Sequence, residues 1–282
     1  LDTVHGVRIG LFVFNYNCDG CAEEGGRLHS EMRSLDDTTR ANLKTEVDAI
    51  SAQTWTPLSE TLYEIGLYFQ GKPSYFNSGV TYTSPIQYHC QKNYVIIITD
   101  GKPTQDRNSV LKDGATKNGV VYPKIGDRDG DKREPIGAVN DPHYPDNGSD
   151  FLDDVAKYLY DSDLRTDMTG QQNIVTYTIG FTINSDILER TATHGHGKYY
   201  YCNNYQELSN QFQNIIADIL SKTSSFVAPI VPVSRMERTT AGDKLYLALF
   251  KPIQNGSWLG NVKKYGVTQQ DDSSVGIRTG DI

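Results

Sequence analysis

The chain has 282 residues, a hydrophobic content of 37% and a formal net charge of −8 at pH 7. Its length is sufficient for one large domain with a well-buried core, or for one domain and part of another. The acidic balance and the absence of a basic run exclude a nucleic-acid-binding surface, and no apolar run approaches the ~20 residues that a membrane-spanning helix needs. Because the chain begins at Leu1 without an initiator Met and ends on Arg278-Thr-Gly-Asp-Ile282, we expect an internal piece of a longer protein.

The amino-terminal part of the chain predicts two strands followed by two helices. The apolar run Arg8–Asn15 is typical of a buried strand, and a short edge strand is expected near Arg27–Ser34. Apolar residues at i, i+4 and i+7 then indicate an amphipathic helix with Leu43, Val47 and Ile50 on its inner face. A stronger helix follows Pro57, where apolar residues recur at helical spacing: Leu58, Leu62, Ile65 and Phe69.

The stretch Tyr94-Val-Ile-Ile-Ile-Thr-Asp-Gly-Lys-Pro-Thr104 predicts the central strand of a sheet. Its unbroken run of Val and Ile is typical of a strand that is buried on both faces, as in a parallel sheet. Gly101 permits a sharp turn, and Pro103 prevents the strand from continuing. Asp100 is thereby expected at the carboxyl end of a strand, which is the edge where open α/β sheets bind their ligands.

A long polar passage, residues 102–149, follows this strand and contains the strongest local cluster of metal ligands. In Asp127-Arg-Asp-Gly-Asp-Lys-Arg-Glu134, the carboxylates of Asp127, Asp129, Asp131 and Glu134 can surround one Ca²⁺ ion, which takes six to eight oxygen ligands. The spacing does not match an EF-hand, because the Gly and the final Glu come too early. The alternative is a solvated acidic loop, and we favour Ca²⁺ because unliganded carboxylates would repel one another in an ordered loop.

The remaining elements predict a mostly parallel sheet with helices on both faces. A helix capped by Asp150 is followed by the strand Ile174–Phe181, a short helix from Ser185, the strand Lys198–Tyr201 and a long helix capped by Asn204. The inner faces of the first and last of these helices are given by apolar spacing: Leu152, Val155, Ala156 and Leu159, then Leu208, Phe212, Ile215 and Ile219.

The sequence texture changes beyond residue 224. Segments 244–251 and 262–267 are typical of antiparallel strands joined by the turn Gln254-Asn-Gly256. We therefore expect an α/β domain over residues 1–224 and the beginning of a β-rich unit over residues 225–282.

The cysteines and histidines do not indicate a catalytic centre. Cys18 and Cys21 are close enough to form a small loop disulfide, which we favour over a redox dithiol. Cys90 and Cys202 are predicted at opposite edges of the sheet and should not pair. The pair His194-Gly-His196 is interpreted as a Gly-rich turn before a strand rather than as a transition-metal site. No nucleophile or nucleotide motif occurs in the sequence, so we expect a protein that is not an enzyme.

Several stretches, in order along the chain, resemble a known family. The strand Arg8–Asn15, the start Thr56-Pro-Leu, Ile98-Thr-Asp-Gly101, Thr176-Tyr-Thr-Ile-Gly180 and the Gly195 turn are similar to a von Willebrand factor A domain. More narrowly, the chain resembles the PilY family of type IV pilus tip adhesins and biogenesis proteins. That resemblance is carried by Cys90–Gly101, Phe151–Tyr160, Gln172–Phe181 and Leu245–Pro252, the last of these resembling the lead-in to a carboxyl-terminal β-propeller.

The resemblance implies a doubly wound sheet with a metal-ion-dependent adhesion site. Thr56 and Asp100 would be ligands of Mg²⁺ or Mn²⁺, and a partner carboxylate would fill an open position. The Asp-x-Ser-x-Ser element that supplies most ligands of such a site is absent, together with the family's first strand. An intact site would therefore need residues outside this chain.

The implied function is adhesion and pilus biogenesis at an extracellular pilus tip. The implied partners are minor pilins or other tip subunits, together with a host or surface ligand. The alternative is a calcium-stabilised structural component of the pilus assembly machinery that has no external ligand.

Overall fold

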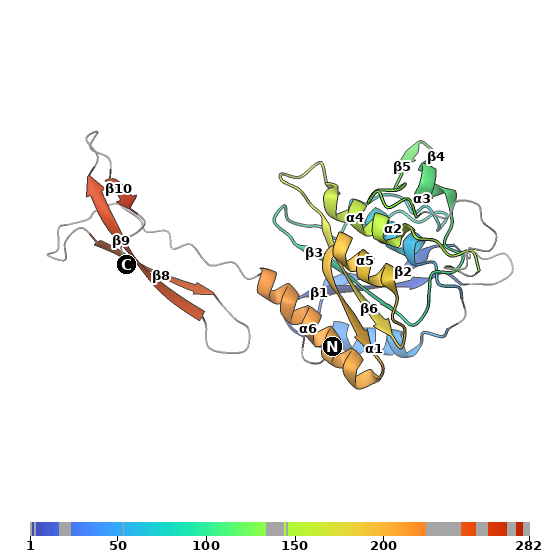
Figure 1. Ribbon diagram of the computed structural model, residues 1–282, viewed down its shortest axis with the longest axis horizontal. Helices are drawn as coiled ribbons and strands as arrows, with labels where there is room; N and C mark the ends of the chain where they lie inside the picture. The colour runs from blue at the N-terminus through green and yellow to red at the C-terminus, as the bar shows by residue number, and fades with distance from the viewer. Residues whose placement is uncertain are drawn as a thin grey trace. The chain divides into compact units, whose positions relative to one another are not determined.

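The computed structural model describes residues 2, 4–16, 24–52, 54–133, 144, 146–223, 244–251, 259–269 and 275–278. The chain divides into two compact units, Leu1–Ile216 and Ala217–Ile282. The first unit is a mixed α/β structure built around a parallel sheet (Figure 1). The boundary predicted between residues 224 and 225 lies outside the described residues.

The parallel sheet has three strands in the order β3-β6-β7: β3 (Asn93–Thr99), β6 (Ile174–Phe181) and β7 (His196–Cys202). The register runs from Asn93 opposite Ile174 to Thr99 opposite Gly180. β6 is the central strand, and Ile174, Tyr177 and Ile179 on it are completely buried. The sequence-based placement of β3 at the centre is therefore wrong. Among the described strands β3 pairs with β6 alone, and this edge position leaves Ile98 47% exposed.

The strand predicted at residues 8–15 is confirmed as β1 (Arg8–Phe14), which forms an antiparallel pair with β2 (Gly26–Ser34). Apolar side chains of β1 pack against two separate hydrophobic clusters. Phe12 and Phe14 pack against the main core, whereas Ile9 and Leu11 pack against a second cluster. The buried members of this second cluster are Val4, Leu35 and Leu43, and Phe212 and Ile216 pack against them.

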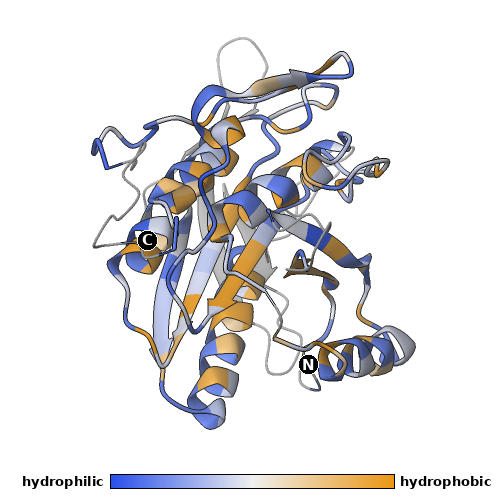
Figure 2. Cartoon of the chain, turned by 90° about the vertical axis from the view of Figure 1, so that its right-hand side faces the viewer, coloured by the Kyte–Doolittle hydropathy of each residue, from blue (hydrophilic) through white to orange (hydrophobic). Residues whose placement is uncertain are grey.

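Two helices follow the hairpin, and the sequence predicted the second better than the first. α1 (Asp37–Asp48) buries Leu43, but Val47 is 49% exposed and Ile50 is 45% exposed, so the predicted inner face is wrong beyond Leu43. The other buried residue of α1 is Arg40, whose guanidinium donates a 2.9 Å hydrogen bond to the carbonyl oxygen of Val4. In Figure 2 the helices carry both apolar and hydrophilic stretches, as expected for helices that bury one side.

α2 (Leu58–Gln70) is buried around most of its circumference and has no side-chain cap of its own. The cap comes instead from Asp106, whose carboxylate accepts hydrogen bonds of 3.0 Å from the backbone N–H groups of both Ser59 and Glu60. Asp106 is fully buried and lies in the segment between β3 and α3 (Ser109–Asp113). The start of α2 is thus stabilised by a residue that is distant in the sequence.

After α3 come a small hairpin, β4 (Ala115–Lys117) and β5 (Val120–Tyr122), and then α4 (Phe151–Asp161). The inner face predicted for α4 is confirmed, because all four of its members are completely buried: Leu152, Val155, Ala156 and Leu159. Asp150 precedes the helix as predicted but makes no side-chain cap bond. Its carboxylate accepts hydrogen bonds from the Tyr144 hydroxyl and the Arg190 guanidinium instead.

α5 (Asp186–His194) and α6 (Tyr205–Thr223) complete the helices of the chain that the structure describes. The predicted cap of α6 is confirmed, since Asn204 Oδ1 accepts a 3.0 Å hydrogen bond from the backbone N–H of Glu207. The Glu207 carboxylate in turn accepts a 2.7 Å hydrogen bond from the backbone N–H of Asn203. No helix in the described ranges is both long and apolar enough to cross a membrane.

The described residues of the second unit form three antiparallel strands in the order β10-β9-β8: β8 (Lys244–Lys251), β9 (Leu259–Gln269) and β10 (Val275–Arg278). The two strands predicted there are confirmed, while the turn at residues 254–256 lies outside the described residues. Cys18 and Cys21 also lie outside them, so their disulfide stays a prediction. Cys90 and Cys202 are both free thiols, so they do not pair with each other, as predicted.

Candidate functional site

The carboxyl end of β3 brings Thr56 close to the turn that carries Asp100. A Cβ atom built on Gly101 would lie 3.8 Å from Thr56 Oγ1. Thr56 is held in place by Thr104, whose Oγ1 accepts a 2.8 Å hydrogen bond from the Thr56 N–H and whose own N–H donates a 3.1 Å bond to the Thr56 carbonyl. Asp100 is exposed. The two residues assigned to an adhesion site therefore lie at one edge of the sheet, although a metal ion there stays a prediction.

The acidic loop is ordered by a succession of short side-chain-to-backbone hydrogen bonds. Asp127 accepts from the N–H of Gly130 at 2.7 Å, Asp129 from that of Asp131 at 3.0 Å, and Asp131 from that of Arg133 at 2.9 Å. Oxygens of the three aspartates lie within 4.8 Å of one another. Asp127 and Asp131 are exposed. The fourth predicted ligand, Glu134, lies outside the described residues.

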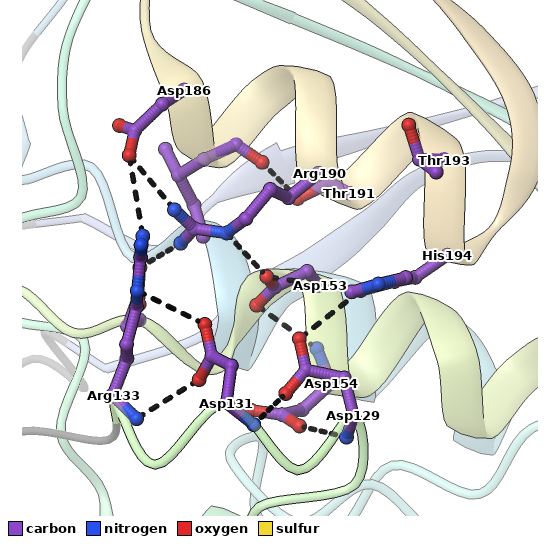
Figure 3. A network of polar contacts seen from close by, with 12 residues as sticks. Asp129, Asp131, Arg133, Asp153, Asp154, Asp186, Arg190, Thr191, Thr193 and His194 are labelled. Carbon is purple, nitrogen blue, oxygen red and sulfur yellow. Dashed lines mark hydrogen bonds and ion pairs between the residues drawn. The ribbon is translucent and has the colours of Figure 1, made fainter.

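Asp129 differs from the other two aspartates because its side chain turns inward. It points toward Asp153 on the first turn of α4 and His194 at the end of α5 (Figure 3). Asp129 Oδ2 lies 3.2 Å from His194 Nδ1, and Asp153 Oδ2 lies 3.9 Å from the same nitrogen. The side chains of Asp129 and Asp153 are only 3% and 2% exposed. These three residues are arranged so that they could hold a metal ion.

Asp154 and Arg190 hold Asp129 and Asp153 in position. The Asp154 carboxylate accepts hydrogen bonds from the backbone N–H groups of Arg128 and Asp129, which ties the loop to α4. Arg190 Nε donates a 2.8 Å hydrogen bond to Asp153 Oδ2. Burial raises the pKa of Asp153 to about 7 and that of Asp154 to about 8, and the negative charge of Asp129 adds to both increases.

Asp153 and His194 were not among the predicted ligands. Sequence reasoning interpreted residues 194–196 as a turn, and the structure separates the two histidines. His196 begins β7 and stacks on the Tyr160 ring with 3.7 Å between ring centroids, whereas His194 faces Asp129. The sequence contains only a weak indication of these two ligands: His194 lies in the last turn of one helix, and Asp153 lies in the first turn of another.

Comparison with known proteins does not assign the chain to a family. No protein-family model matches it, and no curated protein matches it. One solved structure is similar: the crystal structure of an uncharacterized membrane spanning protein from Vibrio fischeri. It shares 15% sequence identity, with 77% of this chain and 78% of that chain covered and a TM-score of 0.22.

Proposed function

We propose that the chain is a binding module of the bacterial cell surface, built on a von Willebrand factor A-like doubly wound sheet and acting in adhesion and assembly at the tip of a type IV pilus. The observation that carries the proposal is the adjacency of Thr56 to the Asp100–Gly101 turn at the carboxyl end of β3. A hydroxyl and a carboxylate at this edge suit a hard cation such as Mg²⁺ or Mn²⁺, which keeps several waters and can accept a partner's carboxylate. The motif order described above supports the family.

Further ligands of this ion would come from residues outside the chain or from the partner. The acidic loop would hold Ca²⁺ through Asp127, Asp129 and Asp131, because oxygens of the three carboxylates lie within 4.8 Å of one another and Ca²⁺ takes oxygen ligands. The partners of the module would be minor pilins or other tip subunits, with a host or surface ligand on the outer side. The proposed location is extracellular.

Metal titration by calorimetry, followed by binding to a captured complex of minor pilins with and without chelator, tests this proposal. We expect Asp100→Ala and Thr56→Val to lose Mg²⁺- or Mn²⁺-dependent binding. Their thermal unfolding midpoints should stay within about 2 °C of the wild type, because Asp100 is exposed and Thr56→Val replaces a half-buried side chain with one of nearly the same size. Asp113→Ala, at an exposed position at the end of α3, is the matched control and should bind like the wild type. Chelator-resistant binding, unchanged in both variants, would contradict the adhesion site.

The structural alternative predicts a different pattern. A calcium-stabilised component of the assembly machinery without an external ligand would show no Mg²⁺- or Mn²⁺-dependent binding to pilins or to a surface ligand in any variant. Chelation would then increase proteolysis between Lys124 and Asp150 without changing the binding of any partner. Measuring both binding and proteolysis therefore separates the alternatives.

A further inference from the structure

We infer that Asp129, Asp153 and His194 form a binding site for a first-row transition-metal ion of the Zn²⁺ class. This site shares Asp129 with the proposed Ca²⁺ loop and is separate from the Mg²⁺ position at Thr56 and Asp100. The three side chains come from the acidic loop, α4 and α5, and they converge on one point (Figure 3). This inference does not depend on the proposed function.

The first argument is an unsatisfied buried oxygen. Asp129 Oδ2 is buried and has no hydrogen-bond partner, and His194 Nδ1 beside it has none either. The two atoms are nevertheless 3.2 Å apart. Buried polar atoms are rarely left without partners, so this pair requires an explanation. Two ligand atoms that coordinate the same metal ion lie this close to each other without forming a hydrogen bond.

The separations also suit such an ion. Ligands about 2.0–2.2 Å from a tetrahedral metal lie roughly 3.3–3.6 Å from one another. The observed separations from His194 Nδ1 are 3.2 Å to Asp129 and 3.9 Å to Asp153. All three ligand atoms lie within 4.8 Å of one another, so side-chain shifts alone would bring them onto one ion.

Charge gives the second argument. Four buried carboxylates gather here, those of Asp129, Asp150, Asp153 and Asp154. Among the described contacts, Arg190 and His194 are the basic side chains that face them; Arg128 lies over the Tyr158 ring, and Arg133 pairs with Asp131 and Asp186. A divalent cation would stabilise the ionised form of these carboxyl groups, which burial otherwise disfavours.

The imidazole decides the class of ion. Ca²⁺ and Mg²⁺ take oxygen ligands, whereas a mixed set of one imidazole and two carboxylates suits Zn²⁺, Co²⁺ or Mn²⁺. Arg190 supplies the outer contact that orients a ligand, because its Nε donates to Asp153 Oδ2 at 2.8 Å. His194 is 31% exposed on its side chain, so the ion could enter from solvent. Three protein ligands would leave a position for water.

Titration of the full chain, freed of metal by chelation, with Zn²⁺, Co²⁺ and Ca²⁺ tests the inference. We expect one Zn²⁺ per chain, a rise in the unfolding midpoint, and visible d–d absorption with Co²⁺. His194→Ala and Asp153→Asn should each weaken Zn²⁺ binding by at least about a hundredfold, because even partners of ligands contribute about 10- to 100-fold. Asp113→Asn and the exposed His89→Ala are the controls and should bind Zn²⁺ like the wild type.

Four results would overturn the site: no stoichiometric Zn²⁺ binding, full binding by folded His194→Ala, equal competition by Ca²⁺, or loss of Zn²⁺ in His89→Ala. The last would mean adventitious binding near the exposed Cys90 thiol. Circular dichroism establishes that each variant is folded, and the Co²⁺ spectrum of the wild type does not depend on any variant.

Discussion

Asp106 shows how strongly one residue can depend on its surroundings. Its carboxylate is fully buried and accepts hydrogen bonds from Ser59 N–H, Ser59 Oγ and Glu60 N–H, with Ser149 Oγ a fourth donor at 3.3 Å. These donors favour the ionised form, but burial outweighs them and raises the pKa of Asp106 to about 7. Glu60 lies beside it, and its pKa is also raised, first by burial and then by the charge of Asp106.

This pKa predicts the direction of a pH effect on stability. An aspartate in the unfolded chain has an ordinary pKa near 3.8, so between about pH 4 and pH 7 the folded state binds more protons at Asp106 than the unfolded state does. The free energy of unfolding should therefore fall as the pH rises through that window, by at most about 1.4 kcal/mol per pH unit from this group. Urea denaturation at several pH values measures the slope.

Asp106→Asn identifies the source of this slope, because asparagine does not titrate. The variant should have a lower free energy of unfolding near pH 5, since one acceptor of the α2 cap becomes a donor, and a shallower slope up to pH 7. Asp153 and Asp154 contribute a slope of the same sign and remain in both proteins. An unchanged slope in Asp106→Asn would contradict the assignment.

At the scale of the elements, the edge position of β3 has a consequence for association. An edge strand exposes backbone N–H and C=O groups to pairing with another chain, and an exposed apolar side chain increases that tendency. Ile98 is 47% exposed on this strand, whereas Ile179 on the central strand β6 is completely buried.

We expect Ile98→Lys to reduce concentration-dependent association, measured by light scattering on mild heating. It should change the free energy of unfolding by less than about 0.5 kcal/mol, because the side chain already lies half in water. The matched variant Ile179→Lys buries a charge at the centre of the sheet and should lower the free energy of unfolding by about 4 kcal/mol or more. Similar losses in both variants would mean that β3 is as well covered as β6.

The same strands show what the sequence can predict. The bounds of β6 match the predicted Ile174–Phe181, because a buried strand between turn residues is a local pattern. A run of isoleucines does not reveal which neighbours a strand has, and β3 was therefore placed at the centre. The candidate site likewise has one part that the sequence predicts and one part that it does not. Alternating aspartates located the acidic loop, but Asp129 meets Asp153 and His194 only through the packing of α4 beside α5, which no local pattern records.

For the whole molecule, α6 connects the two compact units, and the division at residue 216 falls within it. Apolar side chains on the part of α6 within the first unit belong to its core: Phe212 and Ile216 pack against the cluster formed by Val4, Leu35 and Leu43, and Ile215 is completely buried. Although α6 follows the last strand of the parallel sheet, the first unit needs it to cover this cluster.

We therefore expect a fragment of residues 1–223 to unfold cooperatively at the same midpoint as the first transition of the full chain, within about 2 °C. A fragment of residues 1–204 lacks α6, exposes the cluster of Val4, Leu35 and Leu43, and should lose several kcal/mol or fail to fold, since burial of one large apolar side chain contributes about 1.5–3 kcal/mol. Scanning calorimetry of both fragments measures the difference. Because the two fragments differ only in the residues of α6, an equal midpoint for both would mean that α6 belongs energetically to the second unit rather than to the first.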